Sequence, residues 1–125
     1  MIYGIGTDIL RVSRIEKVHA RHGARFAERL LHPRERDLFA AQKKPTVYLA
    51  KAFAVKEAFV KALGTGFAGV AHDDVGCLRT QRGRPELIFS AKLKKRLDRL
   101  RITRAHLSLS DDGDWVCAMV VLERK

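Results

Sequence analysis

The first residues of the chain alternate between two faces, which is the pattern of a β-strand. Over residues 2–9, one face is mainly apolar and is formed by Tyr3, Ile5, Thr7 and Ile9. The other face is formed by Gly4, Gly6 and Asp8. Because a glycine in a strand leaves space beside the backbone, we expect a ligand to approach the strand on this second face, next to Asp8.

Three helical segments follow the strand. The first covers residues 13–30, with Ser13 as its N-cap and a break near Gly23. The second covers about 33–42 and has a proline in its first turn. The third is a long helix that begins at Pro45 or Thr46 and is closed by Gly64.

The second half of the chain contains four more strands and one helix. Residues 73–80 and 85–90 are expected to form strands joined by a turn at 81–85, and Ser90 is expected to cap the next helix. That helix has an apolar stripe of Leu93, Leu97 and Leu100. Strands at 104–110 and 114–123 are expected to be joined by a hairpin turn at 111–113. This order predicts an α+β fold with an N-terminal strand followed by helices, and an antiparallel sheet with helices packed to one side.

Length and composition indicate one domain over residues 1–125. No apolar run approaches the ~18 residues of a membrane span, and the first ten residues do not have the pattern of a signal peptide. Cys77 and Cys117 are expected to be reduced thiols, so we expect a cytoplasmic protein without a membrane partner.

The charge of the chain changes this picture. Lys and Arg number 25 against 14 Asp and Glu, which gives a formal net charge of +11. Such a chain attracts polyanions, and nucleic acid, an acidic protein and a phosphate-rich small molecule all fit.

The long helix carries charges between apolar rows. One row at i, i+4 spacing consists of the small residues Ala50, Ala54, Ala58 and Ala62, which would let another backbone approach closely. The neighbouring row of Phe53, Glu57 and Lys61 contains two charges that burial would leave poorly hydrated. An ion pair between Glu57 and Lys61 is the simplest interpretation, since i, i+4 pairs of this kind are common on helix surfaces.

A diphosphate site is the alternative interpretation. Asp8 and Glu57 offer two hard oxygen ligands, and Mg²⁺ typically takes only one or two carboxylates and completes its shell with water and substrate phosphates. Lys61 adds a cation. The N–H groups of Gly64, Thr65 and Gly66, which follow the helix, are of the kind that cradles phosphate, although a glycine C-cap alone explains Gly64.

Four segments resemble the holo-acyl-carrier-protein synthases, the small bacterial members of the 4′-phosphopantetheinyl transferase superfamily. They are "GIGTDI" (4–9), "FAVKEAFVKALGTG" (53–66), "GRP" (83–85) and "HLSLSDD" (106–112). The segments occur in the order and spacing typical of the family, and the resemblance covers essentially the whole chain.

The resemblance implies a reaction and a set of residues. Coenzyme A would donate its phosphopantetheine arm to a serine of apo-acyl carrier protein in fatty acid biosynthesis, leaving adenosine 3′,5′-bisphosphate. Asp8 and Glu57 would hold Mg²⁺, and Lys61 would lie by the diphosphate. The resemblance also implies coenzyme contacts at the following positions: Lys56, Gly64, Thr65, Gly66, His106, Ser108 and Ser110. Lys56 would equally fit a structural pairing.

The resemblance further implies partners. Acyl carrier proteins are acidic, so Arg14, Arg21 and Arg25 are the expected docking residues, and family members of this size form homotrimers with active sites between subunits. Two positions depart from the family pattern: Ala52 stands where many relatives have an arginine, with Lys51 before it, and Asp111 follows Ser110 where some relatives have a histidine. A contact to the 3′-phosphate of coenzyme A would therefore come from other residues.

The main alternative from another class is a small basic RNA-binding module. The charge of +11 and the basic run at 92–104 favour it. RNA-binding modules, however, stack bases on exposed aromatic side chains that this sequence lacks, and the alternative leaves Asp8 and Glu57 unexplained. A catalytically inactive adaptor for carrier proteins is a third possibility, but the expected metal ligands and Lys61 are all present.

Overall fold

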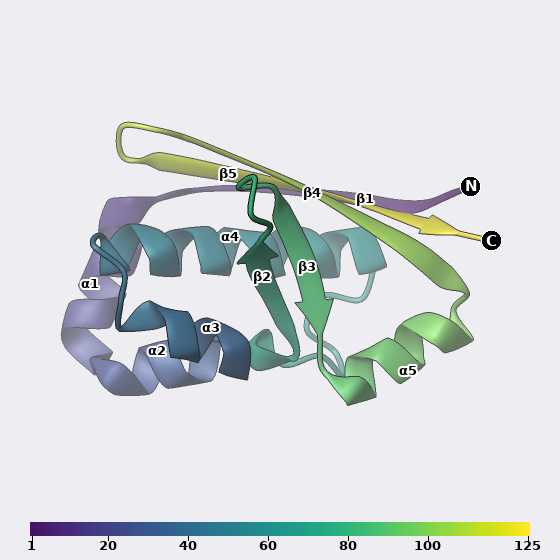
Figure 1. Cartoon of the computed structure of the whole chain (residues 1–125), viewed down its shortest axis with the longest axis horizontal. Coiled ribbons are helices and arrows are strands. Elements are labelled where there is room, and N and C mark those ends of the chain that lie inside the picture. The colour runs from purple at the N-terminus through teal and green to yellow at the C-terminus, as the bar shows by residue number, and fades with distance from the viewer.

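The strands form two antiparallel sheets. In the computed structural model, which describes residues 1–125, the main sheet has the order β1-β5-β4, with β1 at Ile2–Arg11, β4 at Ile102–Asp112 and β5 at Trp115–Arg124. A separate ribbon consists of β2 (Val75–Arg79) and β3 (Pro85–Phe89), and it lies beside α4 and β4. Figure 1 shows that the helices all lie on one side of the main sheet. The expected α+β architecture is therefore confirmed.

Five α-helices and one 3₁₀ turn connect these strands. They are α1 (Val12–His22), α2 (Ala24–Leu30), α3 (Pro33–Phe39), α4 (Pro45–Leu63), η1 (His72–Asp74) and α5 (Ala91–Arg99). The expected break at Gly23 and the C-cap at Gly64 are both confirmed, and Ser90 caps α5 by accepting a hydrogen bond from the Leu93 N–H. No helix is long and apolar enough to cross a membrane.

Helix α4 packs against the glycine face of β1. A Cβ atom at Gly6 would lie 1.9 Å from the Ala58 carbonyl oxygen, and one at Gly4 would lie 1.9 Å from the Ala62 carbonyl oxygen. The alanine row of α4 thus receives a backbone, as the sequence suggests, but the expectation of ligand space beside the glycines is wrong. The helix fills that space, and only the end of the face, at Asp8, stays partly open.

Two local predictions are wrong, one for the start of α1 and one for the β4–β5 hairpin. Ser13 lies inside α1 and is not its N-cap; its N–H and hydroxyl both donate to the Asp114 carboxylate, at 3.0 and 2.6 Å. The β4–β5 hairpin turns at residues 113–114, because β4 continues through Asp112. Gly113 has φ of +58°, as the first position of a two-residue hairpin loop often requires.

The main sheet leaves its outer face uncovered. On that face, four large apolar residues are between 42% and 64% exposed: Ile5, Ile9, Trp115 and Met119. The inner face carries buried side chains that pack on α4, among them Leu10, Val116, Ala118, Val120 and Leu122. An exposed apolar patch of this kind marks an interaction surface.

Candidate active site

Asp8 and Lys61 meet at the open end of the β1–α4 contact. The Lys61 ammonium donates to the Thr7 carbonyl at 3.0 Å and lies 3.3 Å from Asp8 Oδ1. The Asp8 side chain is 16% exposed and the Lys61 side chain 53% exposed. The structure contains no ion pair between Glu57 and Lys61, so the simple i, i+4 interpretation of these charges is wrong. Lys61 pairs across to the strand instead.

Glu57 completes this cluster from the preceding turn of α4. Partial burial raises the pKa of Glu57, and the nearby charge of Asp8 raises it further, whereas Lys61 and Arg14 lower it. Asp8 and Glu57 are thus close enough for their charges to interact. The structure brings together the three residues that sequence analysis selected as catalytic, Asp8, Glu57 and Lys61.

The donor set of this cluster fits a magnesium ion. Two carboxylates that repel one another are stabilised by a divalent cation, and two hard oxygen donors are the usual protein contribution to a Mg²⁺ site. The structure has no group of three or more His, Cys, Asp or Glu side chains arranged for a metal. A cation held by Asp8 and Glu57 would therefore keep positions for water and phosphate oxygens.

The Gly64–Gly66 loop follows α4, and its three residues are exposed. Gly64 has φ of +87° and its N–H caps the helix by donating to the carbonyls of Val60 and Lys61. The N–H groups of Thr65 and Gly66 donate to no protein group, and the Thr65 hydroxyl donates to the Gly66 carbonyl. The loop therefore offers two free backbone donors, while the Gly64 donor is already used by the C-cap.

Lys56 has a structural role, and the expected coenzyme contact is wrong for this residue. Its side chain is 0% exposed, and its ammonium lies 2.8 Å from Glu35 Oε1, while Glu35 is 2% exposed. Lys56 also donates to the Val75 carbonyl. A side chain this deeply buried and fully paired is not available to a ligand, so the alternative of structural pairing holds.

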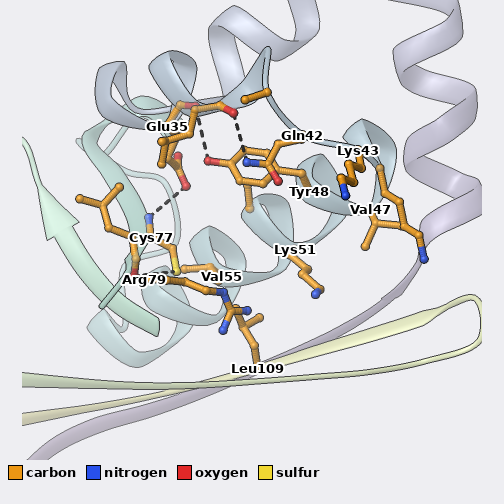
Figure 2. Close-up of a pocket in the computed structure, with 15 residues that line it drawn as sticks. Glu35, Gln42, Lys43, Val47, Tyr48, Lys51, Val55, Cys77, Arg79 and Leu109 are labelled. Carbon is orange, nitrogen blue, oxygen red and sulfur yellow. Dashed lines mark hydrogen bonds between the residues drawn. The ribbon is translucent and has the colours of Figure 1, made fainter. Parts of the chain in front are cut away.

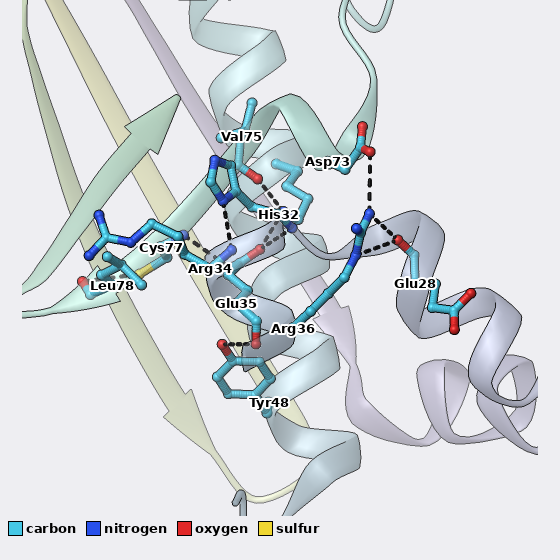
Figure 3. A network of polar contacts seen from close by, with 11 residues as sticks. Glu28, His32, Arg34, Glu35, Arg36, Tyr48, Asp73, Val75, Cys77 and Leu78 are labelled. Carbon is cyan, nitrogen blue, oxygen red and sulfur yellow. Dashed lines mark hydrogen bonds and ion pairs between the residues drawn. The ribbon is translucent and has the colours of Figure 1, made fainter. Parts of the chain in front are cut away.

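Glu35 is the centre of a buried polar network that sequence analysis missed (Figure 3). Besides Lys56, its carboxylate accepts the His32 N–H at 3.0 Å and the Cys77 N–H at 2.9 Å. Burial lowers the pKa of His32, and it raises that of Cys77 to about 11. The network joins α3, α4 and β2, and it fixes the helix that carries Glu57 and Lys61.

His106, Ser108 and Ser110 share the exposed outer face of β4. His106 Nε2 lies 2.7 Å from Glu123 Oε2, and the hydrogen bond from His106 is the main reason that the pKa of Glu123 is lowered. Asp8 lies on the inner face of the same sheet, and β5 separates β4 from β1. One chain therefore does not bring these three residues to the Asp8 cluster.

The expected docking arginines lie on two helices. Arg14, on α1, lies over the Phe53 ring at 5.9 Å from its centroid and is close enough to Glu57 to lower its pKa. Arg21 on α1 and Arg25 on α2 are exposed. Arg14 thus borders the carboxylate cluster, while the other two extend the positive surface away from it.

A cavity of about 640 Å³ lies between α3, the first half of α4, β2 and β4 (Figure 2). Its lining combines apolar residues with four cations, Lys43, Lys44, Lys51 and Arg79. Ala52 lines it too, and Lys51 lies 3.7 Å from Asp111 Oδ1. At 100° per residue, the positions of Lys51 and Val55 are centred about 120° around α4 from those of Glu57 and Lys61.

Comparison with known proteins gives consistent results over the full chain. The model of the 4′-phosphopantetheinyl transferase superfamily matches residues 4–120. A holo-[acyl-carrier-protein] synthase from Thiobacillus denitrificans is 45% identical, over 99% of this chain and 95% of that protein. The crystal structure of the Neisseria meningitidis holo-[acyl-carrier-protein] synthase is similar with a TM-score of 0.96 and 45% identity, covering 99% of this chain and all of that one.

A second similar structure contains a ligand. The holo-(acyl-carrier-protein) synthase from Bacillus anthracis, in complex with CoA (3′,5′-ADP), has a TM-score of 0.83 and 37% identity. The match covers 100% of this chain and 99% of that chain. None of these similar proteins is an RNA-binding module.

Proposed function

The chain belongs to the 4′-phosphopantetheinyl transferase superfamily, and on that basis we propose that it is a holo-acyl-carrier-protein synthase. It transfers the 4′-phosphopantetheine arm of coenzyme A to a serine of apo-acyl carrier protein, giving holo-carrier and adenosine 3′,5′-bisphosphate. The observation that carries this proposal is the meeting of Asp8, Glu57 and Lys61 beside a loop with free N–H groups. The whole chain, 1–125, acts as one transferase domain.

The chemistry needs positioning and positive charge. The serine oxygen forms a bond to the phosphorus next to the pantetheine, and the bond from that phosphorus to the oxygen of the leaving phosphate breaks. Lys61 is placed to neutralise the negative charge that develops on the leaving phosphate or to protonate it. The free N–H groups of Thr65 and Gly66 bind phosphate oxygens.

Asp8 and Glu57 hold Mg²⁺ in this proposal. When bound there, the ion supplies positive charge to the diphosphate oxygens. The side chains of Asp8 and Glu57 would hold the ion, and Lys61, which contacts Asp8, would lie beside it. The serine proton goes to a water or to one of these two carboxylates.

The nucleotide half of coenzyme A needs cations in place of the arginine that many relatives have at position 52. The cavity that contains Ala52 supports an assignment of this role to Lys43, Lys44 and Lys51, because all three line this one pocket. This cavity and the Asp8 cluster face different directions around α4, and we propose that residues of two chains complete the coenzyme A site.

We therefore propose a homotrimer with active sites between subunits. The uncovered apolar face of the main sheet supports this assembly, because a large exposed apolar patch is unfavourable in an isolated chain. The outward placement of His106, Ser108 and Ser110 also supports it, since these residues then contribute to a coenzyme site completed by a neighbouring subunit. Arg14, Arg21 and Arg25 dock the acidic carrier, and the two free cysteines, Cys77 and Cys117, fit a cytoplasmic location in fatty acid biosynthesis.

Mass spectrometry of the carrier tests the proposal. Purified protein is mixed with apo-acyl carrier protein, coenzyme A and Mg²⁺, and the carrier is expected to gain one phosphopantetheine group per molecule. EDTA is expected to stop the reaction, and added Mg²⁺ to restore it. A carrier that stays unmodified under all these conditions, with a folded enzyme, contradicts the proposed function.

A further inference from the structure

The segment that follows the Gly64–Gly66 loop is anchored by an aromatic stack. The ring of Phe67 lies on the ring of His72 of η1, with centroids 4.0 Å apart and an interplanar angle of 22°. His72 also stacks near Phe53 of α4, with centroids 6.0 Å apart. Phe53 is one helical turn before Glu57, so the stack links the end of the loop to the helix that carries the catalytic cluster.

A second anchor comes from α5. Arg96 donates from Nη1 to the Ala68 carbonyl at 2.9 Å. The guanidinium passes directly beside Gly69, where a Cβ atom would lie 2.9 Å from Arg96 Nη1. Gly69 has φ of +74°, so the chain turns here in a conformation that favours glycine and leaves room for the arginine.

Between these anchors and the helix end, the loop has few contacts of its own. Its three residues are exposed, and the only hydrogen bond of a side chain in the loop is the one within it, from Thr65 to Gly66. The direction of the free Thr65 and Gly66 N–H groups therefore depends on where the anchored segment leads the chain. We propose that His72 and Arg96 are positioning residues that hold the Gly64–Gly66 loop in the shape that binds the phosphates of coenzyme A.

This inference rests on the proposed function, and it assigns a role to two residues that do not touch the substrate. The neutral form of His72 suits the stack: burial lowers its pKa, the charge of Lys56 lowers it further, and only Asp73 acts in the opposite direction. An uncharged imidazole packs on the Phe67 ring without bringing a poorly hydrated charge into the contact. Arg96 has a different contribution, because it fixes a backbone carbonyl through a charge-assisted hydrogen bond.

The test compares two anchor variants with two controls. His72→Ala removes the stack, and His72→Phe keeps an aromatic ring without a titratable group. Arg96→Met removes the bond to Ala68, and Arg99→Met removes the same charge from an exposed position of the same helix that makes no hydrogen bond or ion pair with another side chain. Coenzyme A binding is measured by calorimetry, the KM for each substrate by steady-state kinetics, and the mobility of residues 64–69 by hydrogen exchange.

We expect His72→Ala and Arg96→Met to weaken coenzyme A binding about tenfold and to raise its KM similarly, because a less preorganised loop binds more weakly. Hydrogen exchange in residues 64–69 is expected to become faster, with the KM for the carrier unchanged. His72→Phe and Arg99→Met are expected to bind coenzyme A as the wild type does.

Two results would overturn the inference. One is wild-type coenzyme A affinity in both anchor variants; the other is an equal loss in Arg96→Met and Arg99→Met, which would show a general charge effect. If His72→Ala does not fold, Arg96→Met still tests the inference. His72→Phe then shows whether an aromatic ring alone can replace the histidine. Failure of the proposed function looks different, because the wild-type protein itself then leaves the apo-carrier unmodified.

Discussion

Replacing Lys56 by methionine is expected to destabilise the fold strongly, because it leaves the Glu35 carboxylate buried without its counter-ion. Both side chains are almost completely buried, and their charged atoms are 2.8 Å apart. Removing one partner of a buried ion pair typically costs about 3–5 kcal/mol, since the remaining charge stays out of water. The burial of Lys56 also lowers its pKa, whereas the charge of Glu35 and its hydrogen bond to Lys56 raise it, so Glu35 is the main group that favours the charged ammonium.

The loss converts into a measurable change in melting temperature. For a chain of this size, 1 kcal/mol corresponds to about 3–5 °C in Tm, so Lys56→Met is expected to melt roughly 10–20 °C below the wild type. Urea unfolding at pH 7 and at one fixed protein concentration measures the free energy directly, since assembly makes apparent stability depend on concentration.

Two further variants separate the electrostatic cost from lost packing. Glu35→Gln combined with Lys56→Met removes both charges and is expected to recover at least half of the loss, although the Val75 carbonyl stays without its donor. Lys51→Met, on the same helix, breaks only the exposed contact to Asp111 and is expected to cost less than about 1 kcal/mol. A Lys56→Met protein within about 1 kcal/mol of the wild type would refute this reasoning. So would a double variant no more stable than the single one.

Three other predictions follow from the site and its support. Gly6→Ala is expected to separate β1 from α4, because its Cβ would lie 1.9 Å from the Ala58 carbonyl oxygen. Tm and activity are therefore expected to fall together. An unchanged Tm measured by circular dichroism would contradict the close packing. Lys61→Met is expected to lower kcat at least ~10²-fold with near-normal Tm. Turnover within a few-fold of wild type would show that Lys61 has no catalytic role beyond its structural contact with β1. Replacing Arg21 and Arg25 by glutamate is expected to raise the KM for the carrier strongly and to leave coenzyme A affinity constant. High salt should have the same effect on the carrier KM. A loss of coenzyme A affinity instead would show that the carrier docks elsewhere.

Local sequence signals predicted most of the elements correctly. Gly64 closes α4 and Ser90 caps α5, because the residue and its partner lie within one turn of each other. The alanine row of α4 also predicted a close backbone contact. The sequence did not say that the contact would be β1, so the glycines of that strand were attributed to a ligand instead of to Ala58 and Ala62.

Contacts between distant residues were the ones that sequence analysis missed. Asp114 supplies the hydrogen bonds at the start of α1 from 101 positions away, which no local capping rule anticipates. Glu35 lies in the first turn of α3, yet its side chain reaches Lys56 and the Cys77 N–H inside the protein. A buried lysine in an apolar helix was the available signal, since such a charge requires a partner.

The candidate site was predicted better than its surroundings. Asp8, Glu57 and Lys61 were selected because carboxylates and a lysine near a glycine loop suit diphosphate chemistry, and the structure brings all three together. Their pairing was not predicted, because the register of β1 on α4 decides that Lys61 meets Asp8 and not Glu57. His106 shows the other limit: its strand position was clear, but the face of the sheet that it shares with Ser108 and Ser110 points away from the cluster.

The rate of carrier modification by Glu57→Gln tests the central claim most directly. Glutamine keeps the size of the side chain and removes one of the two carboxylate charges that Asp8 and Glu57 present. At saturating coenzyme A and Mg²⁺, we predict that the variant stays folded while the rate of phosphopantetheine gain, followed by mass spectrometry, falls to the level of the wild type in EDTA. A Glu57→Gln enzyme that modifies the carrier at a near-normal rate would contradict the assignment of the site.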